Sequence, residues 1–426
     1  MIKKTKHPVI SKYLTSYAEK EAALTLPDKK YEYCLVIPAF KETRQSLVTV
    51  WRQIKPGTSF LVILVINSDK AEDLSARILF NAITGTKVTQ RLTDQIQLVH
   101  SSKNSRDPDI LLVDRFSSCR VIPNKQGVGL ARKIGMDIAT SLINQGTISR
   151  EWLFTTDADA VLPCNYFNIA TSASDAAFLF PFKHLPEPNL SLPIALYELS
   201  IFYYACGLLW ANSPYAYPAV GSTISCSPHQ YAAVRGFPKR NTGEDFYLLN
   251  KLRKTGNVKL GDGPPVILSG RFSDRVPIGT GQAIKKINQM RSPPNEFTVE
   301  HPDCFSKLKF FMERLNSSSL AQPKQFTTGD AEIDFYIQKI GLLRHYENKR
   351  KQSPAPLVMQ KHLHDWFDAL KTRQFIHHFR DMYFGRISIT DISVAPFLPH
   401  LRWGRGDLNT YLEEAKNALC AFIYHQ

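Results

Sequence analysis

The sequence has no hydrophobic run long enough to form a membrane-spanning helix. A bilayer core requires about 20 consecutive apolar residues. The apolar segment 201–211 is too short, and Asn-Ser-Pro at 212–214 interrupts it. The amino terminus, residues 1–6, is basic, but no apolar stretch of the kind found in export signals follows it. We therefore expect a cytoplasmic protein, and leave open a peripheral contact with the inner face of the membrane.

The sequence also lacks paired cysteines. Its seven cysteines are odd in number and are never spaced as Cys-x-x-Cys. This pattern argues against both a zinc site and a disulfide framework. We expect reduced thiols.

Basic clusters with interleaved aromatic residues, which are typical of nucleic-acid-binding proteins, are absent as well. Lys and Arg are nevertheless in excess, and the net charge is +15. Residues 1–290 contribute +12 of it, and residues 291–426 contribute +3. A solvated surface accounts for most of these charges, and a phosphate-bearing substrate or an anionic membrane could use them. We expect no nucleic-acid partner.

Four short apolar runs in the amino-terminal part contain β-branched or aromatic residues, which is typical of strands buried on both faces. They are Tyr33–Ile37, Phe60–Ile66, Ile96–His100 and Trp152–Thr156. Apolar residues at helical spacing predict a helix at about Gly129–Ile143. This alternation predicts an α/β fold with a mostly parallel sheet flanked by helices. Ligands of such sheets bind beyond the carboxyl ends of the strands.

Three polar segments follow predicted strands, at residues 38–42, 67–69 and 157–159, and one pocket could collect them. Asn67 is a candidate binding residue in the second. The third is Asp157-Ala158-Asp159. Two carboxylates after a buried strand suit Mg²⁺ or Mn²⁺, which prefer oxygen ligands and are often completed by substrate phosphates. The alternative is a loop of capping carboxylates. A calcium loop is excluded, because Val161 and Leu162 stand where it requires Asp or Asn and then Gly.

Four motifs occur in the order and approximate spacing seen in family 2 glycosyltransferases. They are Val36–Glu42, Lys125–Arg132, Asp157–Asp159 and Gly243–Phe246. Over about residues 30–280 the chain resembles an inverting transferase of this family, which has the GT-A fold. The resemblance implies a nucleotide-diphosphate sugar donor and Mn²⁺ or Mg²⁺ as the cofactor.

The resemblance also implies roles for the matching residues. The segment that contains Pro38, Ala39, Phe40 and Glu42 would lie along the nucleotide base and ribose. Asp157 would face the nucleoside, and Asp159 would bind the metal on the diphosphate. Asp245, beside Glu244, would be the general base that deprotonates the acceptor hydroxyl. The alternative for this acidic pair is a helix start, where carboxylates are favoured, and both can hold.

Further candidates could contact the phosphates. Gly127 and Gly129 would let backbone N–H groups approach a phosphate at the start of the following helix, with Lys125 and Arg132 adding charge. A plain loop before a helix is an equal alternative. Arg271 and Arg275 follow the apolar run 266–268 and suit a departing diphosphate. For these two, capping of a loop or an ion pair with Asp274 is an equal alternative.

The Pro-Pro pair at 293–294 predicts a boundary, which gives a catalytic domain at 1–290 and a mainly helical region at 291–426. The Gln-x-x-Arg-Trp motif of processive synthases is absent, although Arg402-Trp403 occurs. We therefore expect a non-processive, metal-dependent glycosyltransferase. The alternatives are a sugar nucleotidyltransferase of related fold and a catalytically silent sugar- or nucleotide-binding protein. The donor sugar, the acceptor and the oligomeric state stay open.

Overall fold

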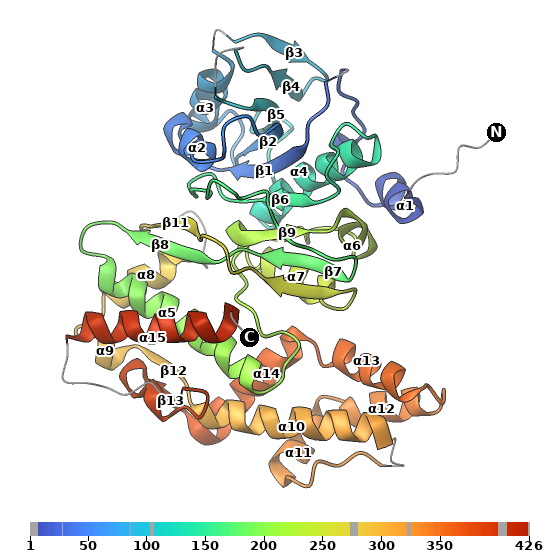
Figure 1. Cartoon of the computed structure of the whole chain (residues 1–426), viewed down its shortest axis with the longest axis vertical. Coiled ribbons are helices and arrows are strands. Elements are labelled where there is room, and N and C mark those ends of the chain that lie inside the picture. Colours follow the sequence, from blue (N-terminus) through green and yellow to red (C-terminus); the bar gives the residue numbers. More distant parts are fainter. Residues whose placement is uncertain are drawn as a thin grey trace. The chain divides into compact units, whose positions relative to one another are not determined.

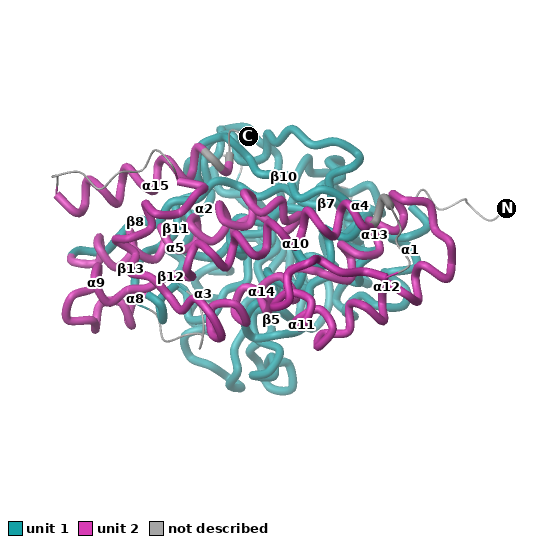
Figure 2. Tube along the Cα trace, turned by 90° about the horizontal axis from the view of Figure 1, so that it is seen from below, with its two compact units in different colours: residues 1–188, 219–283 teal, residues 189–218, 284–426 magenta. Residues whose placement is uncertain are grey.

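The structure is a computed structural model that describes residues 7–27, 29–85, 87–102, 106–272, 280–321, 325–398 and 407–424. The chain forms two compact units, which Figure 2 distinguishes by colour. Unit 1 comprises residues 1–188 and 219–283, and unit 2 comprises residues 189–218 and 284–426. Residues 189–218 thus group with the carboxy-terminal helices. The predicted domain boundary at residue 290 stays a prediction.

Unit 1 is built around a sheet of nine strands in the order β10-β7-β9-β6-β1-β2-β5-β4-β3 (Figure 1). In that order the strands are Asn257–Leu260, Asp175–Leu179, Ile224–Cys226, Leu153–Thr155, Tyr33–Ala39, Phe60–Asn67, Asp109–Arg115, Ile96–Val99 and Thr89–Arg91. Of this sheet, β9 and β4 run against the common direction of the other strands. The predicted α/β fold class, a mostly parallel sheet flanked by helices, is confirmed.

All four predicted strands are present, as β1, β2, β4 and β6. The central strands are buried as their composition predicts, since β2 is buried over its whole length. Strand β5 was not predicted. It lies between β2 and β4, and its apolar run Ile110–Val113 is flanked by the buried carboxylates of Asp109 and Asp114.

The remaining elements of unit 1 flank or extend this sheet (Figure 1). The helices are α1 (Pro8–Ser16), η1 (Lys20–Ala22), α2 (Arg44–Trp51), α3 (Leu74–Thr84), α4 (Gly127–Asn144), η2 (Gly221–Thr223), α6 (Pro228–Ala233) and α7 (Glu244–Leu252). Strands β8 (Phe182–Pro186) and β11 (Val266–Gly270) form a small parallel sheet. Helix α8 (Thr280–Asn288) begins in unit 1 and continues in unit 2.

Helix α4 confirms the predicted helix but is buried on all sides from Gly129 to Ile143. It contacts β1, β2 and β6 as well as α1, η1 and α7. Gly135 permits the close approach to the sheet, because a Cβ atom there would lie 2.3 Å from Cγ1 of Val36. A helix buried all round must provide partners for its polar side chains.

A hydrogen-bonded cluster around Asp137 of α4 provides such partners. Asp137 is 0% exposed, and its Oδ1 accepts hydrogen bonds from Tyr13 (2.5 Å) and Tyr231 (2.8 Å). Its Oδ2 accepts from the backbone N–H of Glu19 (2.8 Å) and from Nζ of Lys133 (2.9 Å). Residues far apart in the sequence are thereby held to α4.

We expect Asp137→Asn to lower the free energy of unfolding by about 3–5 kcal/mol, because Lys133 would stay buried without its charge partner. Urea unfolding followed by circular dichroism measures this loss. The control is Asp94→Asn, which removes an exposed i,i+3 partner of Arg91 and should cost less than about 1 kcal/mol. Equal losses for the two variants would contradict the role of the cluster.

Unit 2 is mainly helical, as the sequence predicts for the carboxy-terminal part. Its helices are α5 (Ser191–Trp210), α9 (Pro293–Glu296), α10 (Pro302–Ala321), α11 (Ala331–Lys339), α12 (Leu342–Arg350), α13 (Pro356–Trp366), α14 (Ala369–Phe379), η3 (Arg380–Phe384), η4 (Ile389–Val394) and α15 (Leu408–Tyr424). Strands β12 (Thr298–Glu300) and β13 (Arg386–Ser388) form an antiparallel pair. The Arg402-Trp403 pair lies outside the described residues.

Helix α5 corrects the expectation that no segment reaches spanning length. It has 20 residues, and its length and hydropathy are those of a helix that can cross a membrane. The uninterrupted apolar run covers only residues 201–211, whereas the helix begins ten residues earlier, at Ser191. Its most apolar window is 61% buried, and the core helix of a soluble protein passes the same test. The fully buried Glu198 of α5 forms an ion pair with Lys416 of α15. Membrane association is therefore not shown.

Candidate active site

Some of the predicted site residues lie at the carboxyl ends of three neighbouring strands, β1, β2 and β6. Strand β1 pairs in parallel with β6 on one side and with β2 on the other. Thr156 continues this pairing by donating its N–H to the Val36 carbonyl (3.1 Å). The segments 38–42 and 157–159 and residue Asn67 therefore leave the sheet at one edge, as ligand-binding segments of α/β sheets do.

Arg132 of α4 joins the Asp-x-Asp segment to the Glu244-Asp245 pair. The Arg132 side chain is 3% exposed and forms an ion pair with Asp157. Its Nε donates to Glu244 (3.3 Å) and its Nη1 donates to the hydroxyl of Thr155 (3.1 Å). Two motifs that lie 87 residues apart in the chain thus share one cation.

The charge of Arg132 is secured by these neighbours. Burial alone would lower its pKa, but the charges of Asp157, Glu244 and Asp245 outweigh burial and raise it. The sequence predicts that Arg132 adds positive charge near a bound phosphate. In the structure its guanidinium instead orients carboxylates, and a phosphate contact stays a prediction.

Three further residues of this cluster were not predicted. Thr155 donates its hydroxyl to the Val36 carbonyl (3.0 Å), and the hydroxyl of Ser222 donates to Asp157. A Cβ atom at Gly221 would lie 2.9 Å from Nη2 of Arg132 and 3.5 Å from Oδ2 of Asp245, so glycine leaves room for both. Gly221 and Ser222 precede β9, which runs antiparallel to β6. The start of an antiparallel strand lies beside the end of its neighbour. Gly221 and Ser222 could have been predicted as site residues only if β9 had been recognised as an antiparallel strand beside β6.

Glu244 and Asp245 open helix α7, after Gly243 in a left-handed conformation (φ 68°). Asp245 is half-buried, and its Oδ1 accepts the N–H of Phe246 (2.7 Å). Burial, with the charge of Asp245, raises the pKa of Glu244 to about 7, while Arg132 opposes this shift. Burial also raises the pKa of Asp245. The predicted helix start is confirmed, and the pKa of Glu244 allows this carboxyl group to exchange a proton near neutral pH.

A second cluster joins Asp159 to the segment after β1. One guanidinium nitrogen of Arg271 forms ion pairs with Asp159 (2.7 Å) and with Glu42 (3.2 Å). Backbone hydrogen bonds between Val161 and Ile267 of β11 bring these chains together, because Arg271 directly follows the end of β11. Of the two predicted arginines, Arg275 lies outside the described residues.

The donor atoms of this second cluster fit a hard divalent cation. Asp159 and Glu42 supply carboxylate oxygens, and both side chains are already held close to one positive charge. Within the described residues no three His, Cys, Asp or Glu side chains form a metal cage. A cation held by one or two carboxylates needs no such cage, because water and substrate phosphates complete its coordination. The Arg271 guanidinium would have to leave Asp159 for the cation to bind there.

Gly127 and Gly129, in the first turn of α4, pack against the loop at residues 238–241. A Cβ atom on Gly129 would lie 2.4 Å from the Pro238 carbonyl oxygen, and Gly127 has a φ of 35°. The N–H groups of Gly127 and Gly129 donate to carbonyls of Pro123 (3.2 Å) and Arg240 (2.9 Å). Close packing is thus their observed role, and phosphate binding by these N–H groups stays a prediction.

The other predicted binding residues are placed as follows. Pro38 and Ala39 are buried at the end of β1, Phe40 is half-buried just after it, and Lys125 is exposed. Asn67 is 6% exposed, and its Oδ1 is buried without a hydrogen-bond partner among the described residues. A buried acceptor without a donor costs free energy, so a ligand donor at this position would be favourable.

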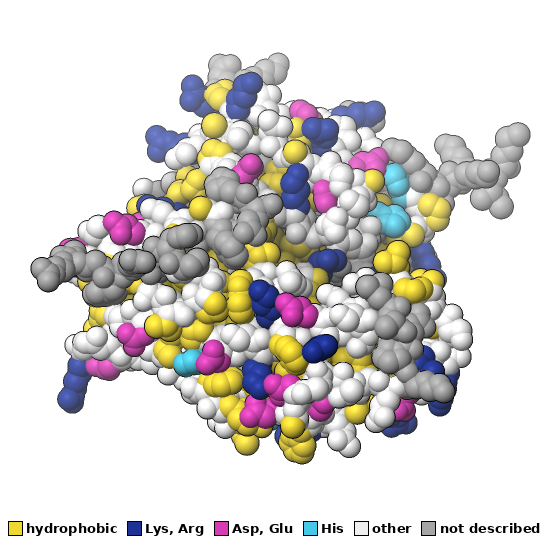
Figure 3. Space-filling view, turned by 60° about the horizontal axis from the view of Figure 1, so that its bottom comes forward, with side chains coloured by type: hydrophobic (Ala, Val, Ile, Leu, Met, Phe, Trp, Pro, Cys, Tyr) yellow, Lys and Arg dark blue, Asp and Glu magenta, His cyan; other side chains and the backbone are white. Residues whose placement is uncertain are grey.

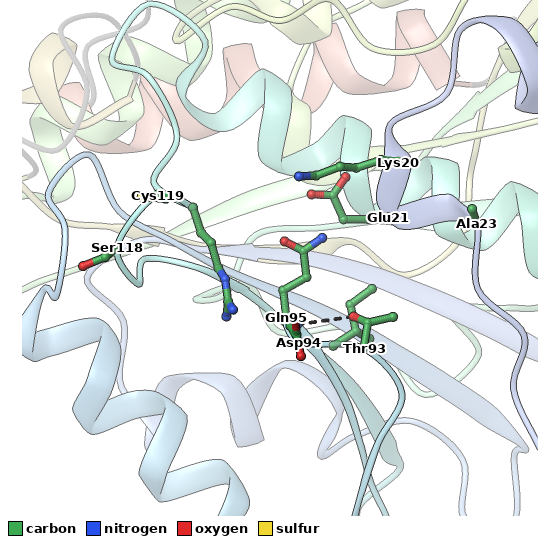
Figure 4. A pocket seen from close by; sticks show the side chains of 10 residues that line it. Lys20, Glu21, Ala23, Thr93, Asp94, Gln95, Ser118 and Cys119 are labelled. Atoms are coloured by element: carbon green, nitrogen blue, oxygen red, sulfur yellow. Dashed lines mark hydrogen bonds between the residues drawn. The ribbon is translucent and has the colours of Figure 1, made fainter.

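A shallow cleft of about 520 Å³ lies elsewhere in unit 1 (Figure 4). Its charged lining residues are Lys20, Glu21, Asp94 and Arg120. Glu21 is paired with Arg115, Arg120 with Asp114, and Asp94 with Arg91. None of the predicted site residues lines this cleft, and its charges are largely matched within the chain.

Comparisons with known proteins find no matching family model and no matching curated protein. Among solved structures, TarS 1-349 of S. aureus in complex with UDP-GlcNAc is 14% identical, with a TM-score of 0.35. The match covers 82% of this chain and 92% of that one. The mannosyltransferase PcManGT from Pyrobaculum calidifontis, in complex with GDP-Man and Mn²⁺, is 13% identical with a TM-score of 0.38, and the match covers 85% and 92%. Similarity at this level does not establish a shared family or shared ligands.

Proposed function

We propose that this protein is a metal-dependent glycosyltransferase of the family 2 type. It would move a sugar from a nucleotide-diphosphate donor to an acceptor hydroxyl, with inversion and without processive synthesis. One observation carries the proposal: Arg132 joins Asp157 to the Glu244-Asp245 pair at the strand ends where Arg271 joins Asp159 to Glu42. In this proposal Asp157 lies on the donor side and the Glu244-Asp245 pair supplies the base, and the ion pairs of Arg132 with Asp157 and Glu244 support this arrangement.

In this proposal the donor lies along residues 38–42, with its base near the amide oxygen of Asn67, which has no hydrogen-bond partner in the described part of the chain. Asp157 faces the nucleoside, held in place by Arg132 and Ser222. Asp159 holds Mn²⁺ or Mg²⁺, which neutralises charge on the leaving diphosphate. Arg271, released from Asp159, supplies a guanidinium to the same diphosphate, for which its planar donors are suited.

On the acceptor side, Asp245 takes the proton of the attacking hydroxyl. Inversion requires this base on the face of the sugar opposite the leaving diphosphate. Glu244 and Arg132 orient Asp245 and set its electrostatic environment. The acceptor itself, whether a sugar, a lipid-linked sugar or a small molecule, is not specified by these residues. We place the enzyme in the cytoplasm.

Donor hydrolysis and thermal shift with a panel of nucleotide sugars and Mn²⁺ test the proposal. UDP-GlcNAc and GDP-mannose are the first probes, because the two solved glycosyltransferases above bind them. We expect stabilisation by one class of nucleotide that increases with Mn²⁺. A chain that no nucleotide sugar or nucleoside diphosphate stabilises, with or without the metal, would end the proposal.

Arg271→Gln should change metal binding and nucleotide binding in opposite directions. Without the guanidinium, Asp159 and Glu42 lose one competing cation, so the affinity for Mn²⁺ alone should rise. The affinity for a nucleoside diphosphate with Mn²⁺ should fall about tenfold or more, because a charge-assisted hydrogen bond to phosphate is lost. Titration calorimetry measures both affinities.

The control for this prediction is Arg52→Gln, at an exposed arginine of unit 1, which should change neither affinity. Loss of both affinities in equal measure would indicate that Arg271 only supports the local structure. An unchanged nucleotide affinity would exclude it from the diphosphate site.

A further inference from the structure

The turn between α12 and α13 in unit 2 exposes aliphatic side chains next to basic ones. Leu357 and Val358, in the first turn of α13, are 73% and 47% exposed. Of residues 351–358, all except the half-buried Pro354 are exposed. The two aliphatic side chains are not part of the core-facing side of α13, which Met359 and Leu363 already occupy with 0% exposure.

The charge around this turn is strongly of one sign. Residues 342–361 contain five Lys or Arg residues and one acidic residue, Glu347. Lys349, Arg350 and Lys351 are consecutive and end α12 just before the turn. Because the turn joins the end of α12 to the start of α13, the basic run and the aliphatic pair lie at the same end of these two helices. Figure 3 shows one face of the molecule, on which hydrophobic side chains lie among Lys, Arg, Asp and Glu side chains.

We propose that this tip, residues 349–358, docks on a membrane surface that contains anionic phospholipids. Lys and Arg are attracted to anionic headgroups, and each such side chain near the surface strengthens binding by about fivefold. Leu357 and Val358 would enter the boundary between headgroups and acyl chains, where exposed aliphatic side chains are buried favourably. This contact is independent of the proposed transferase activity.

The composition of the tip favours lipid over nucleic acid. Binding to single strands combines basic side chains with aromatic residues on which bases stack. The tip has no aromatic residue between positions 347 and 365, and its exposed apolar side chains are aliphatic. The exposed Lys351, the half-buried Lys349 and Arg350, and two exposed aliphatic side chains support a weak, reversible attachment that depends on salt.

Flotation of the full chain with phosphatidylcholine vesicles, with and without phosphatidylglycerol, tests the proposal. We expect the wild-type protein to float with the anionic vesicles and to be released by salt. Leu357→Ser with Val358→Ser should reduce the bound fraction at least several-fold, and so should Lys349→Gln with Lys351→Gln. The donor-dependent thermal shift should be unchanged in both double variants.

Matched double variants in unit 1 are the controls. Leu74→Ser with Ile78→Ser changes two aliphatic side chains that are 71% and 60% exposed, and Lys12→Gln with Lys30→Gln changes two exposed lysines. Both should float like the wild type. Undiminished flotation of the Leu357/Val358 variant would overturn insertion of the tip. If the protein does not float with anionic vesicles, the proposal as a whole is overturned. Retention on DNA in place of flotation would be one such result.

Discussion

Asp245→Asn is expected to lower turnover by ~10²–10⁴-fold, because a positioned general base is typically worth this much in rate. Asparagine keeps the shape of the side chain and can still accept the Phe246 N–H, but it cannot take the acceptor proton. Affinities for the donor and for Mn²⁺ should change little, since neither is held by this group. Steady-state kinetics on the true acceptor, with separate titration of the nucleotide, measures the two effects.

The control is Asp262→Asn, at an exposed carboxylate of unit 1. Its turnover should equal that of the wild type. Product with retained anomeric configuration, or near-normal turnover of Asp245→Asn, would contradict the assignment of the base.

The acidic pair also gives the reaction a pH dependence with a defined sign. Because the pKa of Glu244 is raised to about 7 and that of Asp245 is also raised, kcat/KM should increase with pH through the neutral range as the pair ionises. The apparent pKa belongs to the pair and not to one residue. Glu244→Gln removes a negative neighbour, so the increase should shift to lower pH. A profile that Glu244→Gln leaves unmoved would show that the two carboxylates do not act together.

The same shift predicts how stability changes with pH. A carboxyl group with a raised pKa is favoured in its neutral form by folding. Its contribution is therefore fully present below pH about 4.5 and is lost as pH rises to about 7. Glu244→Gln should flatten this part of the curve of unfolding temperature against pH.

The fold was predictable where burial leaves a simple pattern. Strands β1 and β2 are buried on both faces, and their continuous apolar runs predict such strands. Helix α5 is longer than its continuous apolar run at 201–211, because its first ten residues include polar ones such as Glu198. Helix α4 showed the opposite difficulty, since an apolar stripe predicts one buried face whereas Arg132, Lys133 and Asp137 are buried too. Polar residues become buried only when distant segments supply partners, and a local pattern does not contain those partners.

The motifs name candidate site residues, but they do not contain the contacts between these residues. The motifs named Asp157, Glu244 and Arg132, yet only the folded chain shows that Arg132 links the two carboxylates. No sequence motif indicates Ser222. Its hydrogen bond to Asp157 forms because the antiparallel pairing of β9 with β6 brings the start of β9 beside the end of β6. The roles of these residues in binding and catalysis stay predictions until they are measured.

Asp159→Asn is expected to abolish the part of nucleotide binding that depends on metal. A nucleoside diphosphate with Mn²⁺ at a concentration of 100 times Kd should stabilise the wild type by about 2.7 kcal/mol. In Asp159→Asn the stabilisation should fall to that of the nucleotide alone, because the substituted amide carries no charge to hold the cation. The folded structure should persist, since Asp159 is partly exposed and makes its ion pair with Arg271 at the edge of the site.

Thermal shift with nucleotide alone, Mn²⁺ alone and both together separates these contributions. Asp262→Asn again serves as the control and should retain the full effect of Mn²⁺. In Asp159→Asn, the nucleotide without metal should stabilise the protein at least as much as it stabilises the wild type, because one negative charge near the diphosphate has been removed. Unchanged metal dependence in Asp159→Asn would mean that the cation is held elsewhere, and the assignment of this carboxylate would be wrong.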